Sequence, residues 1–347
     1  MQVKKDNPFT LTFGRKPNEY INRYESLDAI VSTFEAENPV SQAIMIEGVR
    51  GSGKTVLMTA AQKELAAKKN WVTVDLNSTE NLIEDLAMRL SNEFKRPTSA
   101  IKSGFSVSVG GFGVGINGGE APNEIGIIEE MLRHLADKKK KLLITIDEVQ
   151  HNKYMRSFAS EFQILIRKNY PVYLLMTGLY ENIYAIQNDP ALTFLLRTPK
   201  IVLEPLSINQ ITKQYKRIFD TDDETARRLA IITKGYAFAF QALGLLYYEY
   251  GDELPFERIL SDFDDMLDDF VYKKIWESMS EQDKKIALAI GENTAKVQSV
   301  CEKVGMNSTS FSKYRDRLIK RGIIESSKHG YVSLALPRFA NIITSYT

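Results

Sequence analysis

One stretch of the sequence decides the fold: Gln42-Ala-Ile-Met-Ile-Glu47-Gly48-Val-Arg-Gly-Ser-Gly-Lys54-Thr55. Its apolar first part predicts a buried strand, and the spacing of apolar residues after Thr55 predicts a helix. Between them lies a full match to the pattern G-x-x-x-x-G-K-[ST], in the strand-to-helix position that this pattern requires. Glycines suit such a turn because backbone N–H groups can approach phosphate oxygens without a Cβ in the way. The stretch therefore predicts a nucleotide-binding loop.

The pattern gives each residue of this loop an expected role. The backbone is expected to surround the phosphates through Gly48, Val49, Arg50, Gly51, Ser52 and Gly53. The Lys54 ammonium supplies positive charge to the β- and γ-phosphates, and the Thr55 hydroxyl binds Mg²⁺. The first turn of the helix adds partial positive charge at the same place. The expected cofactors are ATP and Mg²⁺.

Two acidic residues follow another strongly apolar run, Leu142–Ile146. A carboxylate at the end of a strand adjacent to the phosphate-loop strand can hold Mg²⁺ through water, and Asp147 fits this role. Glu148 can orient or deprotonate the water that attacks the γ-phosphate. The alternative is that both acids cap the helix that follows. Together they favour hydrolysis of ATP over simple binding.

Two further residues are candidates for the reaction. The run Val172–Met176 ends at Thr177, whose hydroxyl would sit between the γ-phosphate and the attacking water, or would instead cap a helix. Arg197 precedes the short apolar run Ile201–Leu203. From that edge it can reach the γ-phosphate of its own or of a neighbouring subunit's nucleotide. A surface ion pair is the alternative for Arg197.

Short apolar runs alternate with amphipathic segments upstream of residue 205. The expected strands are 42–47, 71–76, 142–146, 172–176 and 201–203, and the expected helices are 56–68, 82–94, 124–138 and 154–168. Near-continuous apolar strands bounded by helices indicate a parallel sheet buried on both faces, in a three-layer α/β architecture. Residues 207–250 are expected to be helical only. The segment 105–116, FSVSVGGFGVGI, interrupts the alternation and predicts a hairpin with one apolar face.

The composition is typical of a soluble globular protein. The 347 residues predict two or three domains, and 44% hydrophobic with 26% charged residues excludes a disordered chain. A single cysteine, Cys301, cannot form an internal disulfide, which favours a reducing cytoplasm. The first twenty residues hold no apolar signal segment, and no apolar run approaches the ~18 residues of a membrane helix. Membrane proteins are therefore excluded from the expected classes.

The net charge of the chain is negative just before residue 270 and positive in the region after it. Residues 252–270 carry eight acids and one base, whereas the chain from Ser280 onward carries eleven bases and six acids. In this basic part, helices are expected at 281–290, 296–304 and 308–321, followed by two short strands that form a wing. The expected inward residues of the third helix, after an N-cap at Asn307, are Phe311, Tyr314, Leu318 and Ile319, and the outward ones are Thr309, Ser310, Ser312, Lys313 and Arg317.

These C-terminal elements resemble a winged helix, in which the third helix enters the DNA major groove and the wing touches the backbone. The outward residues mix hydroxyls with cations, which suits phosphates better than base edges. The net positive charge favours DNA as the partner. A protein-binding winged helix, or one that only caps the lid, is the alternative.

Taken in order, the motifs resemble those of the AAA+ ATPases, in particular the branch that holds archaeal origin-recognition-like initiators and STAND-type ATPases. The resemblance rests on Walker A at 48–55, Walker B at 142–148, a sensor-1 strand ending at Thr177, and Arg197. The segments Asn7-Pro-Phe-Thr and Ile21-Asn-Arg23 are similar to that branch's adenine-side segment, which implies a nucleotide contact for Arg23. Where many AAA+ proteins carry a sensor-2 arginine, this chain has Gly235-Tyr-Ala-Phe-Ala-Phe-Gln241.

The resemblance implies a P-loop NTPase (AAA+) core of the α/β class, followed by an all-α lid and a winged-helix domain. The expected domains are an adenine-side segment at 1–40, the nucleotide-binding core at 41–205 with a hairpin insertion at 103–118, the lid at 206–270 and the winged helix at 271–347.

Two functions remain open at this point. In the first, the protein hydrolyses ATP and its nucleotide state positions the winged helix on DNA. In the second, the protein is a STAND-like switch with slow or negligible hydrolysis, and the winged helix binds a protein partner. A homo-oligomer is compatible with either function, because Arg197 can act on a neighbouring subunit's nucleotide.

Overall fold

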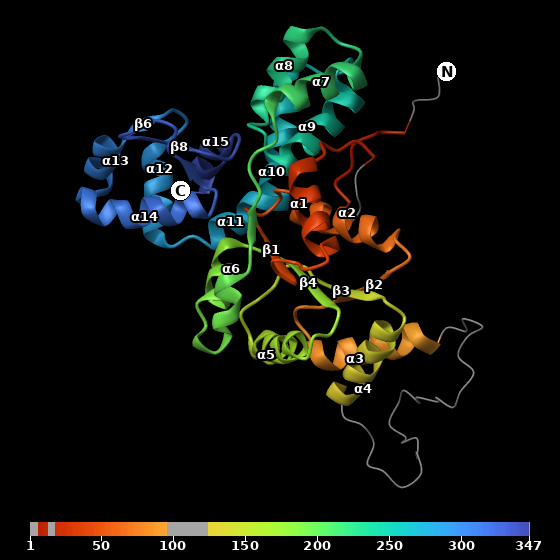
Figure 1. Ribbon diagram of the computed structural model, residues 1–347. Helices are drawn as coiled ribbons and strands as arrows, with labels where there is room; N and C mark the ends of the chain where they lie inside the picture. Colours follow the sequence, from red (N-terminus) through yellow and green to blue (C-terminus); the bar gives the residue numbers. More distant parts are fainter. Residues whose placement is uncertain (1–5, 13–17, 96–123, 347) are drawn as a thin grey trace. The chain divides into compact units, whose positions relative to one another are not determined.

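The computed structural model describes residues 6–12, 18–95 and 124–346, and these residues form two compact units (Figure 1). Unit 1 contains the described residues of Met1–Arg23, Gly48–Val56 and Val202–Thr347, and unit 2 those of Tyr24–Glu47 and Leu57–Ile201. Each unit has its own hydrophobic core. The hairpin expected within 103–118 lies outside the described residues.

A five-stranded sheet with the order β2-β3-β4-β1-β5 forms the centre of unit 2. Its strands are β1 (Ala43–Glu47), β2 (Trp71–Leu76), β3 (Lys141–Ile146), β4 (Val172–Gly178) and β5 (Lys200–Val202). Strand β4 pairs in parallel with β1 on one side and with β3 on the other, and β3 pairs in parallel with β2. All five expected strands are confirmed. The strand that precedes Asp147, β3, was expected beside the phosphate-loop strand β1, but β4 lies between them.

Helices cover both faces of this sheet. Residues such as Met45, Ile144 and Leu174 share a core with helices on one face, namely α3 (Leu82–Lys95), α4 (Glu124–Asp137) and α5 (Lys153–Arg167). On the other face Phe34 of α1 (Tyr24–Glu35) packs edge-on against Tyr173 of β4, with ring centroids 5.3 Å apart. Figure 1 shows α1 on the side of the sheet opposite α3–α5. The sheet of this P-loop NTPase fold is therefore the middle layer of three, as expected.

The remaining helices of the α/β region connect the strands. They are α2 (Lys54–Ala66), α6 (Tyr180–Gln187) and the 3₁₀ segment η1 (Pro190–Arg197). The four helices expected between residues 56 and 168 are confirmed, with α2 beginning two residues early at Lys54. Helices α1 and α6 were not among the expected elements.

Only helices lie between β5 and residue 277, and for residues 207–250 this was expected. They are α7 (Ile208–Phe219), α8 (Asp223–Ile232), α9 (Ala237–Tyr250), α10 (Phe256–Leu267), the π-helical turn η2 (Asp268–Tyr272) and α11 (Lys273–Glu277). Within the described ranges, no helix is both long and apolar enough to cross a bilayer.

The N-terminal segment packs on these helices through Phe9. The Phe9 ring is buried and contacts the rings of Tyr215 and Phe240 edge-on, with centroids 5.9 and 5.5 Å away. It also lies over Gly244 of α9, where an added Cβ would come within 2.7 Å of three ring carbons. The glycine thus makes room for the phenylalanine, and the segment becomes part of the core of unit 1.

The C-terminal part of unit 1 combines helices with a small sheet. Its elements are α12 (Glu281–Ile290), β6 (Ala295–Lys296), α13 (Val297–Val304), α14 (Ser308–Lys320), β7 (Ile324–Glu325), β8 (Tyr331–Leu334), α15 (Phe339–Ile343) and η3 (Thr344–Tyr346). The strands are antiparallel in the order β6-β8-β7. The two expected strands are confirmed, and β6 adds a third that is too short to give a periodic signal.

One side chain of α14 departs from expectation. Ile319, expected to face inward, is 38% exposed. Arg317 is exposed as expected, and it also donates to the buried Asp283 carboxylate of α12 at 2.6 Å, while Arg321 lies 3.6 Å from the same carboxylate. Asp283 also completes a capping box with Ser280. A buried carboxylate requires opposite charge and hydrogen-bond donors, and this requirement draws both arginines toward α12.

Replacing Gly244 with alanine tests the packing of the N-terminal segment. In an exposed helix this change stabilises by up to about 1 kcal/mol, whereas here we expect a loss of about 1–3 kcal/mol, because the new methyl group overlaps the Phe9 ring. Denaturant unfolding of Gly244→Ala measures the change. The control repeats it in a Phe9→Ala background, where Gly244→Ala should no longer destabilise. Equal losses in both backgrounds would contradict the proposed contact.

Candidate functional site

Two glycines of the phosphate loop adopt backbone conformations that side chains disfavour. Gly51 has φ +75° and Gly53 has φ +92°, both in the left-handed region. At Gly51 an added Cβ would also lie 2.3 Å from the Tyr236 hydroxyl oxygen. Successive turns of this kind direct backbone N–H groups toward one concave side, which is how a loop binds an anion.

The carbonyl oxygens of the same loop are all engaged. Lys54 Nζ donates to Gly48 O and to Val49 O, both at 3.0 Å. The next three carbonyls accept from more distant parts of unit 1: Arg50 O from the Tyr236 hydroxyl, Gly51 O from Phe238 N at 3.1 Å, and Ser52 O from Arg23 Nη2 at 3.2 Å. Five consecutive carbonyls are therefore held by donors, which fixes the path of the loop.

This geometry fits a nucleotide phosphate. Lys54 is 7% exposed, and a buried ammonium on backbone carbonyls is well placed to exchange those neutral acceptors for phosphate oxygens. Thr55 is the second residue of α2, so its hydroxyl lies in the first helical turn, where P-loop proteins hold Mg²⁺.

Arg23, expected at the adenine side, binds the backbone. Besides Ser52 O, its guanidinium donates to Glu204 O at 2.6 Å. Burial lowers the pKa of Arg23, and the nearby Glu204 carboxylate opposes that shift. Arg23 thus connects the segment before α1 to the phosphate loop and to Glu204, which lies two residues after the end of β5.

In unit 2, Asp147 and Thr177 come together at the ends of neighbouring strands. The buried Thr177 hydroxyl donates to Asp147 Oδ1, and that oxygen also accepts from Glu148 N at 3.1 Å. Glu148 N lies 3.1 Å from Thr177 Oγ1 as well. The parallel register aligns Ile146 with Met176, so the next residue of each strand meets its counterpart.

The Glu148 backbone is strained. Its φ of +48° lies in the left-handed region, which side chains other than glycine rarely adopt and which costs about 1–3 kcal/mol. The conformation is held from both sides, because Glu148 O accepts from Ser78 Oγ at 3.2 Å and Ser78 O accepts from Asn152 Nδ2 at 3.1 Å. Such outliers persist where the surroundings fix them, most often at reactive sites. The contact of Ser78 could not be predicted from the sequence, because Ser78 lies in a turn among ordinary turn residues.

The capping alternatives do not apply. The N-cap of α5 is Asn152, whose side chain accepts from Met155 N, so Asp147 and Glu148 do not cap that helix. The N-cap of α6 is Leu179, so Thr177 does not cap it either.

Arg197 is exposed at the end of η1. Across the described residues it forms no salt bridge, so the surface ion-pair alternative finds no support there. A cluster that the sequence did not predict precedes it: the Asp189 carboxylate accepts from His151 Nε2 and Arg156 Nε, both at 2.8 Å. The His151 hydrogen bond, the Ala191 amide and Arg156 hold the pKa of Asp189 at about 2. Asp189 thereby fixes the residues after Glu148 to η1.

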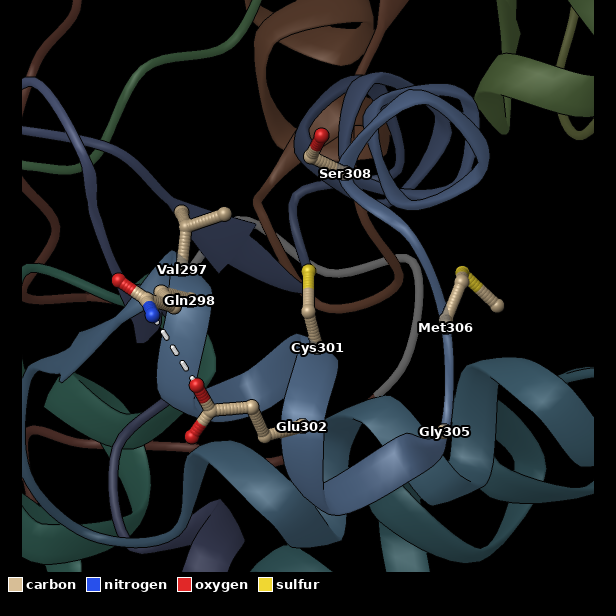
Figure 2. Close-up of a pocket in the computed structure, with 7 residues that line it drawn as sticks. All are labelled: Val297, Gln298, Cys301, Glu302, Gly305, Met306 and Ser308. Carbon is tan, nitrogen blue, oxygen red and sulfur yellow. Dashed lines mark hydrogen bonds between the residues drawn. The ribbon is translucent and has the colours of Figure 1, made fainter.

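A separate cavity of about 530 Å³ lies in the C-terminal part of unit 1. Figure 2 shows the residues that line it, from α13 and the turn into α14: Val297, Gln298, Cys301, Glu302, Gly305, Met306 and Ser308. Gln298 Nε2 donates to Glu302 Oε1, one turn further along α13, at 3.1 Å. None of the residues expected to bind nucleotide lines this cavity.

Comparison with known proteins agrees with this fold. The AAA domain family matches residues 40–184, and a family described as a domain of unknown function, DUF8462, matches residues 269–343. No curated protein is significantly similar in sequence. The fold resembles the Walker-type ATPase PABY2304 of Pyrococcus abyssi, with TM-score 0.64, 14% identity and coverage of 94% of this chain and 96% of that one. It also resembles the ORC2 protein of Aeropyrum pernix, with TM-score 0.60, 13% identity and 94% of each chain covered. Residues 40–184 thus match the AAA domain family, and the described chain has a P-loop NTPase fold.

Proposed function

We propose that the protein binds ATP with Mg²⁺ and hydrolyses it. The observation that carries this proposal is the strained Glu148 backbone, fixed by Asp147, Thr177 and Ser78 beside a strand end. A domain that only binds nucleotide has no need to hold a carboxylate residue in this conformation. The complete phosphate loop supplies the binding half of the reaction.

Each residue then has a defined task. The loop amides and Lys54 bind the phosphates and stabilise the charge that develops on them. Thr55 and Asp147 hold Mg²⁺, Asp147 through water, and the metal supplies charge neutralisation at the phosphate oxygens. Glu148 orients the attacking water and accepts its proton. Thr177 positions Asp147 and the Glu148 amide through its hydroxyl.

Two arginines complete the proposed site. Arg23 donates a hydrogen bond to the Ser52 carbonyl and so keeps the phosphate loop in a conformation that can bind nucleotide. Arg197 is exposed, and we assign it the role of an arginine that neutralises the γ-phosphate, in its own subunit or in a second copy.

Lys54→Ala and Glu148→Gln separate binding from hydrolysis. Lys54→Ala should abolish ATP binding, because it removes the cation that the motif supplies to the β- and γ-phosphates. Glu148→Gln should keep ATP affinity and lower turnover by about 10²–10⁴-fold, because an amide cannot accept the proton. Equilibrium titration with a fluorescent ATP analogue and phosphate release measure the two effects. Turnover of Glu148→Gln at the wild-type rate would contradict hydrolysis by this residue.

Thr177→Val tests positioning by the hydroxyl that donates to Asp147. The change keeps the shape but removes the donor to Asp147, so we expect turnover to fall by about tenfold with ATP affinity nearly unchanged. The matched control is Thr145→Val, which removes another buried hydroxyl, from β3, whose partner is Asp75 of β2. Equal effects of both substitutions would assign Thr177 to the stability of the sheet alone.

We further propose that residues 271–347 form a winged helix that binds DNA according to the nucleotide state. The order of elements supports it: three helices, α12 to α14, then the antiparallel β7 and β8 with the turn at His329-Gly330. The first turns of α14 expose Ser308, Thr309 and Lys313, which suit phosphate oxygens.

A protein partner is the second candidate, and a specific observation favours it. Arg317 and Arg321, two of the cations of the basic segment, pair with the buried Asp283 carboxylate, so they add less to the positive surface than unpaired cations would, although the Arg317 side chain is 43% exposed. A STAND-like switch needs no such surface, since its winged helix would contact protein.

Salt dependence distinguishes the two partners. If α14 binds phosphates, duplex affinity falls steeply between 50 and 200 mM salt, and Lys313→Ala reduces the salt slope by about 1 for every sequence tested. Fluorescence anisotropy with labelled duplex, with and without ATP, measures this. The matched control is Lys284→Ala, because Lys284 pairs with Glu281 on α12. Absence of duplex binding at 50 mM salt in both nucleotide states would leave the protein partner as the function.

A further inference from the structure

The start of helix α9 contacts the phosphate loop directly. Tyr236, the N-cap of α9, donates its hydroxyl to Arg50 O, and Phe238 N, in the first turn, donates to Gly51 O at 3.1 Å. This is the place where the resemblance to AAA+ proteins would put a sensor-2 arginine. Here the contact is made to the loop backbone, so it responds to the path of the loop itself.

Tyr236 is joined to the C-terminal elements by a second buried tyrosine. The ring of Tyr236 stacks on that of Tyr272, with centroids 6.4 Å apart and 23° between the planes. Tyr272 is fully buried, donates its hydroxyl to Pro337 O at 2.6 Å, and packs edge-on against Phe339 of α15 at 4.9 Å. Burial raises the pKa of both phenols, so both hydroxyls remain protonated donors at neutral pH.

Two more contacts run between the same parts of unit 1. Lys234, two residues before Tyr236, donates to Leu334 O of β8 at 2.8 Å. Val49 of the phosphate loop lies against Gly322, at the turn between α14 and β7, where an added Cβ would approach to 3.3 Å. The loop and the strands after α14 are thus linked both through the two tyrosines and directly.

We propose that Tyr236 and Tyr272 are positioning residues that transmit the state of the phosphate loop to the C-terminal elements. The proposal rests on ATP binding at this loop, the function proposed above. When phosphate oxygens replace the carbonyl partners of Lys54, the loop backbone shifts, and the Arg50 carbonyl moves relative to the Tyr236 hydroxyl. Because the two rings are buried and stacked, the displacement reaches Pro337 and Phe339 through close-packed atoms and not through a mobile side chain.

Two conservative substitutions test this. Tyr236→Phe and Tyr272→Phe keep both rings and remove one hydroxyl each. The measurement is amide hydrogen exchange of residues 322–343, with and without Mg²⁺ and the non-hydrolysable analogue AMP-PNP, on the full chain. In the wild type the analogue should change exchange in this region. In both variants that response should be lost, while the Kd for the analogue changes by less than about tenfold, the range expected for one neutral hydrogen bond.

The matched control is Tyr215→Phe. Tyr215 is equally buried in the same helical region, and its hydroxyl donates to Phe240 O at 2.7 Å without contacting the phosphate loop. This variant should keep the wild-type exchange response. A response lost in all three variants would assign the effect to general loosening of the helices and overturn the inference.

The remaining outcomes separate this inference from the proposed function. If the wild type binds the analogue and Tyr236→Phe and Tyr272→Phe respond as the wild type does, the transmission role is wrong and ATP binding stands. If the wild type binds the analogue without any change in residues 322–343, the transmission role is also wrong. If the wild type does not bind the analogue at all, the proposed function fails, and the inference with it.

Discussion

The structure depends on the fixed path of five peptide units, Gly48 to Ser52. A loop that presents amides to an anion must turn its carbonyl oxygens elsewhere, and a buried carbonyl without a donor is costly. In this protein the donors are Lys54, Tyr236, Phe238 N and Arg23. Lys54 belongs to the loop motif, as does Ser52 N, which donates to Val49 O, whereas Tyr236, Phe238 and Arg23 lie far away in sequence and complete the phosphate site of unit 1.

The same principle acts at the strand ends of unit 2. The Thr177 hydroxyl and the Glu148 amide both lie on Asp147, and the Glu148 backbone is held where an unsupported residue would relax. A parallel register fixes which residues meet there, and the register follows from strands buried on both faces. Packing of the sheet thus determines the positions of Asp147 and Glu148. A substitution in the core is therefore expected to displace Glu148 before it unfolds the domain.

These two features explain how much of the molecule could be predicted from sequence. Strand and helix positions were predictable, because near-continuous apolar runs and a phosphate-loop pattern are local signals. The meeting of Asp147 with Thr177 was not predicted, because it requires β3 and β4 to be neighbours, and strand order has no local signal in the sequence. Ser78 and Tyr236 could not be assigned, because each acts through one hydrogen bond to a distant backbone group, and a serine in a turn or a tyrosine before a helix has no periodic signature. Helical spacing correctly placed Arg317 outward, but it could not reveal the ion pair that Arg317 makes with the buried Asp283 carboxylate.

The pairing of Arg317 and Arg321 with Asp283 changes how the net positive charge of the C-terminal region is interpreted. Net charge counts every arginine equally, yet a cation that neutralises a buried carboxylate is already engaged and adds little to a surface potential. With Arg317 and Arg321 paired with Asp283, part of the positive charge at α14 is neutralised by that carboxylate. DNA binding by this region would then rest on a few phosphate contacts, which makes it weak unless it is strengthened by the orientation of the module or by several copies. A contact from Tyr236 and Tyr272 to the strands after α14 supplies a physical reason for such an orientation to follow the nucleotide, and this gives the missing sensor-2 arginine a structural counterpart in two phenols.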